Sequence, residues 1–189
     1  MSLSEKRVVV VGGTSGMGLA TARLAAELGA EVVAAGRRPL EERDPLAGVT
    51  QTRVDATDEA SVKALFDEVG ELDHLFVTSS PGLPGPLLEQ DLTSARSFID
   101  GKLLSSWMCA RYAAPRMRAG GSITFVTGCA VLRPPRHAAM VVAAFAAVEA
   151  LSRALALELG PLRVNTIRPG YTDSEMWSGL QPGERDQLA

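Results

Sequence analysis

Short apolar runs rich in valine alternate along this chain with longer segments that mix apolar, small and charged residues. The short runs are typical of buried β-strands, and the longer segments are typical of α-helices. Strands are predicted at Arg7–Val11, Glu31–Ala35, Val49–Val54, Leu72–Thr78, Ser122–Thr127 and Arg163–Ile167. Helices are predicted at Gly16–Leu28, Asp58–Val69, Leu92–Arg118 and Ala138–Leu159.

This alternation predicts an α/β fold in one domain, residues 1–189: a doubly wound parallel sheet (Rossmann fold) with helices on both faces. Pro115 is expected either to kink the helix Leu92–Arg118 or to begin its last turn. After Gly170 the sequence becomes polar and irregular, and no further strand is predicted.

The composition narrows the class of protein. Hydrophobic residues make up 46% and charged residues 22% of 189 residues, as in ordinary globular domains. The net charge is -3 without a long basic run, which argues against a nucleic-acid partner. The apolar stretch Ala138–Leu159 contains Glu149, Arg153 and Glu158, so it predicts a packed helix rather than a membrane span.

The two cysteines, Cys109 and Cys129, lie on different predicted elements and do not suggest a disulfide framework. No signal peptide is visible before the first predicted strand, so a reducing, cytoplasmic location is expected. If the strand that ends near Thr127 continues, Cys129 is expected to be a small buried residue rather than a nucleophile. No metal site is predicted.

A glycine-rich turn separates the first predicted strand from the first predicted helix. Its residues are Gly12, Thr14, Ser15, Gly16, Met17 and Gly18. Glycines allow a tight turn, and they let backbone N–H groups at a helix N-terminus approach a pyrophosphate. Because strand and helix flank the turn as such a site requires, we predict dinucleotide binding; the alternative is a structural turn without a ligand.

The end of the second predicted strand indicates which dinucleotide binds. NAD-preferring sites carry an acidic residue there, which accepts from the ribose 2′-hydroxyl. This chain has Gly36, Arg37 and Arg38 instead. A guanidinium can hold a 2′-phosphate by two charge-assisted hydrogen bonds, so NADP(H) is the predicted cofactor. The alternative is that one or both arginines are solvated surface charges.

Taken together, these motifs resemble those of the short-chain dehydrogenase/reductase family over nearly the whole chain. The similar segments are the turn Gly12–Gly18, Asp55 after the third strand, Gly121–Ile123, Leu151–Leu159 and Arg163–Gly170. The resemblance implies that Val54 and Asp55 lie at the adenine, and that Thr78, Ser79 and Ser80 lie beside the nicotinamide ribose. It further implies cofactor contacts for Pro169, Gly170, Thr172 and Ser174. The family's chain normally continues with a further helix and an edge strand, so this final strand is expected to be missing here.

The family's proton-transfer residues are not found at their expected positions. Members carry a Ser after the fifth strand, a Tyr-x-x-x-Lys pair on the following helix and an Asn on the preceding helix. Ungapped counting from the flanking motifs puts Gly128 at the Ser position, Val141 and Phe145 at the Tyr and Lys positions, and Lys102 at the Asn position. Neither Val nor Phe can transfer a proton, so ordinary family chemistry is not predicted.

Two other residues are candidate proton donors. Lys102 would lie beside a positively charged nicotinamide, which lowers the pKa of an ammonium group. Its alternative is a surface lysine or a partner of Asp100. His137 lies in a loop expected to border the substrate cleft, and histidine titrates near neutral pH. Its alternative is an exposed histidine without a role.

Two functions therefore remain open. The first is an NADP(H)-dependent oxidoreductase that acts on a small carbonyl or alcohol with a non-standard proton-delivery site. The second is a catalytically silent NADP(H)-binding protein that acts as a sensor or assembly partner. The resemblance and the alanine-rich helix Ala138–Leu159 also imply a homodimer or homotetramer, with a small-molecule substrate as the other partner.

Overall fold

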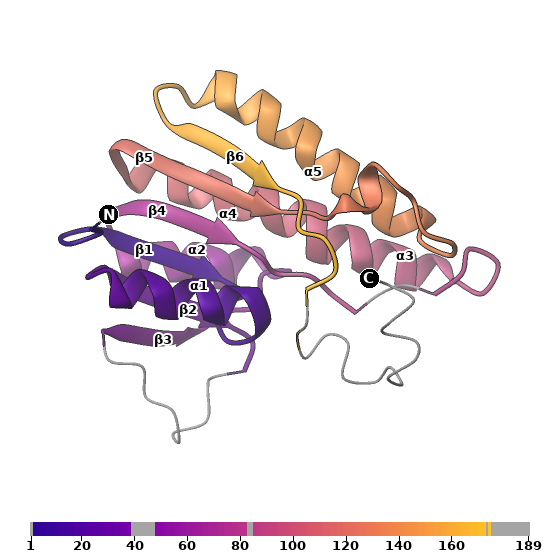
Figure 1. Cartoon of the computed structure of the whole chain (residues 1–189), viewed down its shortest axis with the longest axis horizontal. Helices are drawn as coiled ribbons and strands as arrows, with labels where there is room; N and C mark the ends of the chain where they lie inside the picture. The colour runs from indigo at the N-terminus through magenta and orange to yellow at the C-terminus, as the bar shows by residue number, and fades with distance from the viewer. Residues whose placement is uncertain (1, 39–47, 83–84, 173, 175–189) are drawn as a thin grey trace.

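The computed structural model of the chain describes residues 2–38, 48–82, 85–172 and 174 (Figure 1). Its centre is a sheet of six parallel strands in the order β3-β2-β1-β4-β5-β6. The strands are β1 (Arg7–Val11), β2 (Glu31–Gly36), β3 (Val49–Arg53), β4 (Leu72–Val77), β5 (Met117–Val126) and β6 (Arg163–Ile167). This confirms the predicted parallel, doubly wound sheet.

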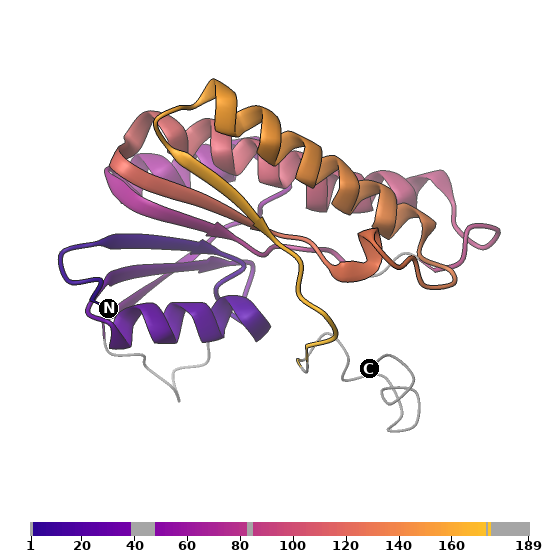
Figure 2. The same cartoon turned by 45° about the horizontal axis from the view of Figure 1, so that its top comes forward.

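Helices cover both faces of the sheet (Figure 2). The α-helices are α1 (Gly16–Glu27), α2 (Glu59–Val69), α3 (Leu92–Ile99), α4 (Ser105–Ala113) and α5 (Ala139–Glu158). Residues Ala22 and Ala25 of α1 pack on one side of β1 and β2. Residues of α2, α4 and α5 form the larger core cluster on the opposite face, around Val9, Leu75 and Phe125. Successive strand residues point to opposite faces, so a continuous valine run such as that of β1 serves both clusters.

The prediction of one long helix over Leu92–Arg118 is wrong. A π-helical turn, η1 (Asp100–Leu104), separates α3 from α4, and the 3₁₀ turn η2 (Ala114–Arg116) follows α4. Pro115 lies in this last turn, which agrees with the second of the two placements expected from the sequence. β5 then begins at Met117 rather than at Ser122, because Met117 pairs with Leu72 at the start of β4, ahead of an irregularity in the register.

Helix α5 is long and apolar enough to cross a membrane by length and composition alone. In this fold a third of that stretch (33%) is buried inside the protein. Val148 and Leu155 contribute to the core beneath the helix, and Val141 and Ala144 pack with Phe98 of α3. The helix thus forms part of the layer that covers the sheet, as the sequence predicted.

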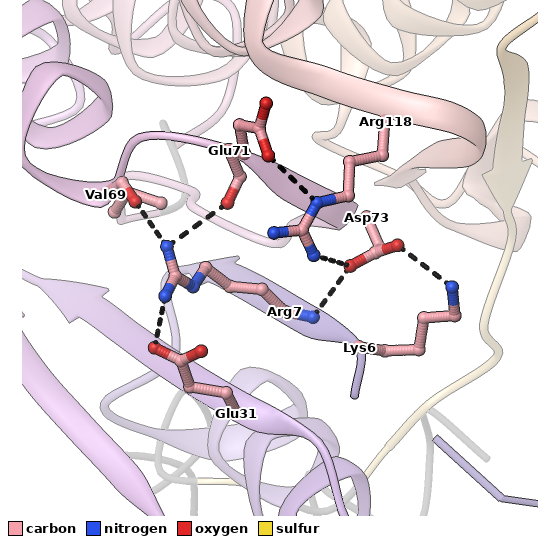
Figure 3. A network of polar contacts seen from close by, with 7 residues as sticks. All are labelled: Lys6, Arg7, Glu31, Val69, Glu71, Asp73 and Arg118. Atoms are coloured by element: carbon pink, nitrogen blue, oxygen red, sulfur yellow. Dashed lines mark hydrogen bonds and ion pairs between the residues drawn. The ribbon is translucent and has the colours of Figure 1, made fainter. Parts of the chain in front are cut away.

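A network of charged groups ties together the amino ends of β1, β2, β4 and β5 (Figure 3). The carboxylate of Asp73 on β4 accepts from the backbone N–H of Arg7 at 2.9 Å, from Lys6 Nζ at 3.1 Å and from Arg118 Nη1 at 3.0 Å. Arg7 also pairs with Glu31 at the start of β2. The network holds the amino ends of the strands together. Ligands in folds of this class bind at the opposite, carboxyl ends of the strands.

Candidate functional site

A cleft of about 190 Å³ lies at the carboxyl ends of the strands, where the strand order reverses between β1 and β4. Most of the residues predicted to hold a dinucleotide line it: Gly12, Thr14, Ser15, Gly16, Met17, Arg37, Arg38, Val54, Asp55, Thr78, Ser79, Ser80 and Ser174. Thr172 borders a neighbouring groove along α1. Gly18, Pro169 and Gly170 line neither hollow; the carbonyl of Pro169 accepts from the backbone N–H of Cys129 at 3.0 Å.

Two glycines of the turn are required by close approach of the backbone. Gly12 has a φ of 87°, and a Cβ there would lie 2.8 Å from Ser79 N. A Cβ at Gly18 would lie 2.0 Å from the carbonyl oxygen of Gly12. The side chain of Ser15 does not cap α1, so the N-terminus of this helix faces the cleft without an anionic or capping side chain in its first turn. Such a turn fits a pyrophosphate.

The turn is anchored to both neighbouring strands. The N–H groups of Gly12 and Gly13 donate to the carbonyl of Ala35 on β2 at 2.8 and 3.0 Å. On the other side, Thr78 N donates to Val11 O at 2.9 Å. The end of β2, the glycine turn and the end of β4 therefore form one rigid floor of the cleft.

Charged groups gather at the β2–β3 end of the cleft. Arg37 and Arg38 are exposed, and within the described part of the chain neither forms an ion pair. The carboxylate of Asp55 accepts from Thr57 Oγ1 at 2.7 Å and from Thr57 N at 2.9 Å. These hydrogen bonds lower the pKa of Asp55, and the charge of Arg37 contributes further. The arginines thus remain available to an anionic ligand, because Asp55 is held by Thr57.

Lys102 is buried in the π-helical turn η1, with only 2% of its surface exposed. Its Nζ donates to the carbonyl of Ser79 at 3.2 Å and lies 5.4 Å from the centroid of the Phe145 ring. Burial lowers the pKa of Lys102 to about 8. The interpretation of Lys102 as a surface lysine or as a partner of Asp100 is therefore wrong. Its amine is buried against the carbonyl of Ser79, a residue that lines the cleft.

Two serines that the sequence reasoning overlooked hold this turn in place. Ser106 Oγ donates to the carbonyl of Lys102 at 2.7 Å, and Ser105 Oγ donates to the carbonyl of Gly101 at 2.9 Å. A π-helical turn leaves carbonyl groups without their usual helical partners, and such turns are frequent at functional sites. The adjacent serines in an otherwise apolar segment were the available sequence signal.

The positions that carry the family's proton-transfer groups form an apolar cluster here. Val141 is buried against Phe98 and Ala144, and Phe145 packs beside them. A Cβ at Gly128 would lie only 2.9 Å from Phe145 Cε2. The phenylalanine ring therefore fills the space next to Gly128, and a serine there would require the ring to move.

The structure does not bring His137 into the site. His137 is exposed in the loop before α5, with a φ of 63°, and it does not line the cleft. Cys129 is exposed as well, so the expectation that it is buried is wrong. The strand ends at Val126, and the 3₁₀ turn η3 (Cys129–Val131) removes the alternation on which that expectation depended. No group of three or more His, Cys, Asp or Glu side chains suited to a metal ion occurs in the described ranges.

The chain matches a known family over almost its whole length. Residues 11–188 match the family model described as enoyl-(acyl carrier protein) reductase. The chain belongs to the short-chain dehydrogenase/reductase family. This confirms the family resemblance that was predicted from the glycine turn and from the segments Leu151–Leu159 and Arg163–Gly170.

Characterised relatives of this short-chain dehydrogenase/reductase are named as oxidoreductases. It is 36% identical to cis-4-hydroxycyclohexanecarboxylate dehydrogenase of Sinomonas cyclohexanicum, covering 100% of this chain and 82% of that protein. It is 32% identical to L-fucose dehydrogenase of Rattus norvegicus, covering 98% and 73% of the two chains. A small-chain dehydrogenase solved in complex with NADPH is 32% identical, with a TM-score of 0.78 over 98% of this chain and 79% of that one.

Proposed function

We propose that this chain is an NADP(H)-dependent oxidoreductase that interconverts a small carbonyl compound and the corresponding alcohol. The observation that carries the proposal is the cleft, in which a glycine turn required by close contacts is combined with Arg37 and Arg38. The family match supports oxidoreductase chemistry, and the relative solved with NADPH supports the choice of cofactor. When bound, NADP(H) supplies or accepts the hydride.

Within this proposal the residues divide the work by position. The backbone of the turn from Gly12 to Gly18 holds the pyrophosphate, and Arg37 and Arg38 hold the 2′-phosphate. The buried amine of Lys102 holds the proton at Nζ, with Ser79 orienting it through a 3.2 Å hydrogen bond. A pKa of about 8 suits a group that gives up or takes a proton near neutral pH. Neither candidate lines the cleft itself, but Lys102 contacts Ser79, which does, whereas His137 is exposed in the loop before α5 and is therefore the weaker of the two.

Calorimetric titration with NADP⁺ and NAD⁺ tests the cofactor assignment. The wild type is expected to bind NADP⁺ at least about tenfold more tightly, because a bidentate arginine–phosphate contact is a strong, charge-assisted interaction. Arg37→Glu should abolish this preference, whereas Arg96→Glu, an exposed arginine on α3, should keep it. An unchanged preference in Arg37→Glu would overturn the assignment.

Stopped-flow oxidation of bound NADPH against a panel of aldehydes and ketones tests the catalytic step. Lys102→Met should reduce turnover by about 10²–10⁴-fold, the usual effect of losing a general acid. Lys63→Met, at an exposed lysine on α2, is the matched control and should leave turnover unchanged. Full turnover in Lys102→Met would show that the proton comes from elsewhere.

A second candidate function is favoured by one observation, the apolar cluster at Gly128, Val141 and Phe145. A catalytically silent NADP(H)-binding protein would be expected to lack proton-transfer groups at these positions. Tight NADPH binding combined with no turnover on any carbonyl compound would favour this sensor or assembly role over the enzyme.

We also propose that copies of this chain associate as a homodimer or homotetramer through α4 and α5, in the cytoplasm. Trp107 of α4 is 39% exposed, and the exposed side of α5 carries small residues that permit close helix contact: Ala139, Ala143, Ala150 and Ala154. Light scattering should give a dimer or tetramer at micromolar concentration, and Ala150→Arg should reduce it to a monomer. A monomeric wild type would count against the proposal.

A further inference from the structure

The glycine turn and the end of β2 meet at one contact, between Thr14 and Gly36. A Cβ atom at Gly36 would lie 2.3 Å from Thr14 Oγ1, 2.9 Å from its Cγ2 and 3.1 Å from its Cβ. The φ of Gly36 lies outside the left-handed region, so any residue could adopt this backbone conformation. The side chain of Thr14 is therefore what keeps a larger residue out of position 36.

Neither side of this contact can easily move. The carbonyl of Ala35 accepts from Gly12 N and Gly13 N, and the carbonyl of Gly36 accepts from Val54 N at 3.0 Å. The backbone at position 36 is thus held by the turn on one side and by β3 on the other. Threonine is β-branched, so rotation about χ1 only changes whether Oγ1, Cγ2 or a hydrogen atom of Thr14 lies next to position 36. The Cβ atom of Thr14 stays where it is.

Position 36 matters because it is the last residue of β2. The end of this strand is where an NAD-type site carries the carboxylate that accepts from the ribose 2′-hydroxyl. Here Gly36 is buried, and the exposed residues that follow it toward the cleft are Arg37 and Arg38. An acidic side chain at position 36 would have to pass through the volume that Thr14 occupies.

We propose that Thr14 is a specificity-determining residue of the dinucleotide site: it fills the space over Gly36, excludes an acidic side chain there, and leaves the 2′ end of the cofactor to the arginines. This inference rests on the proposed NADP(H)-binding function and deepens it. Cofactor preference is then set by two residues acting together, one in the glycine turn and one in β2, in addition to the charge of Arg37 and Arg38.

Calorimetric titration of four proteins with NAD⁺ and NADP⁺ tests the inference without any need for turnover. Gly36→Asp alone should weaken both dinucleotides and gain no NAD⁺ preference, because the new Cβ displaces the turn. Adding Thr14→Ala should strengthen NAD⁺ binding by about tenfold over Gly36→Asp, the effect expected for relieving one overpacked contact. Adding Thr14→Val instead should give no gain, because valine has the shape of threonine without its hydroxyl group.

The outcomes separate this inference from the function on which it rests. A wild type that binds neither dinucleotide overturns the proposed function. A wild type that prefers NADP⁺, together with a Gly36→Asp variant that already binds NAD⁺ as tightly as Thr14→Ala/Gly36→Asp, overturns the inference alone. A gain in Thr14→Val/Gly36→Asp equal to that in the alanine variant also overturns it, because the effect is then not steric.

A thermal unfolding cycle on the free protein tests the contact itself. Gly36→Ala should lower the Tm by about 3–6 °C, as expected for one overpacked site in a domain of this size. In a Thr14→Ala background the same substitution should cost about half as much or less. Equal losses in both backgrounds would mean that Thr14 does not crowd position 36.

Discussion

The guanidinium of Arg168 donates two hydrogen bonds of 2.6 Å to the carboxylate of Glu149. Glu149 lies in the middle of α5 and is only 5% exposed, whereas Arg168 directly follows β6. Thr127 Oγ1, beyond the end of β5, donates to the same carboxylate at 3.1 Å. These contacts join α5 to the segment that leads to Pro169 and Gly170. From the sequence, Glu149 had only been predicted to interrupt an apolar helix.

We predict that Glu149→Gln lowers the Tm at neutral pH. The hydrogen bond from Arg168 lowers the pKa of Glu149 in spite of its burial. A lowered pKa in the folded state contributes stability above the unfolded pKa, and this contribution is lost as the pH falls. The difference in Tm from wild type should therefore be present at pH 7 and shrink below about pH 4.3. Glu158→Gln, exposed at the end of α5, is the control; an equal difference at both pH values would contradict the prediction.

Restoring the family's serine at Gly128 is expected to harm this chain. The new Cβ would meet the Phe145 ring at 2.9 Å, so Gly128→Ser should lower the Tm by about 3–6 °C. Adding Phe145→Ala removes the clash, and the double variant should lose less than the sum of the two single losses. Gly82→Ser serves as the control, since a Cβ there meets no atom within 4 Å. Additive losses would show that Gly128 and Phe145 are not coupled.

Much of the fold could be predicted because its signals are local. β1 and β6 have the predicted bounds, since β1 is a short valine run that ends at a glycine and β6 ends shortly before Pro169. The start of β5 could not be predicted, because Arg118 is held in the sheet by the carboxylate of Asp73, 45 residues away. The π-helical turn was missed because an apolar helical pattern does not reveal where an extra residue enters a turn.

The candidate site also has features that the sequence predicts and features that it does not. The glycine turn was predictable because strand and helix directly flank it. The environment of Lys102 was not, because its partner Ser79 lies 23 residues away and burial by Phe145 depends on how α5 packs. The contact between Thr14 and Gly36 also depends on the register of β1 against β2, which pairs Val11 with Ala35. The sequence thus predicted most of the residues that line the cleft, but not the contacts between them.

The Asp73 network is expected to make the fold sensitive to acid. Burial alone would raise the pKa of Asp73, but hydrogen bonds from Arg7 N and Lys6 and the charge of Arg118 outweigh it and lower the pKa. The stability that this carboxylate provides is present above about pH 3.9 and is lost as the pH falls through its folded pKa. Asp73→Asn should therefore lower the Tm at pH 7, and that deficit should shrink as the pH falls below about 3.9. Asp100→Asn, at an exposed position, should match wild type throughout, and a constant deficit in Asp73→Asn would contradict this account.

Lys102 should affect stability in the alkaline range. Burial lowers its pKa to about 8, whereas in the unfolded chain it titrates near 10.5. Between these values the unfolded state binds more protons, so the stability of the wild type should rise from pH 8 to pH 10.5. Lys102→Met lacks this rise; it should be more stable than wild type at pH 7, by at most about 3 kcal/mol, and the gap should close toward pH 10.5. Urea unfolding at several pH values measures both slopes. Lys63→Met is the control, because that lysine is exposed on α2. Parallel curves for wild type and Lys102→Met would mean that the amine keeps an ordinary pKa, and the buried proton donor proposed above would lose its physical basis.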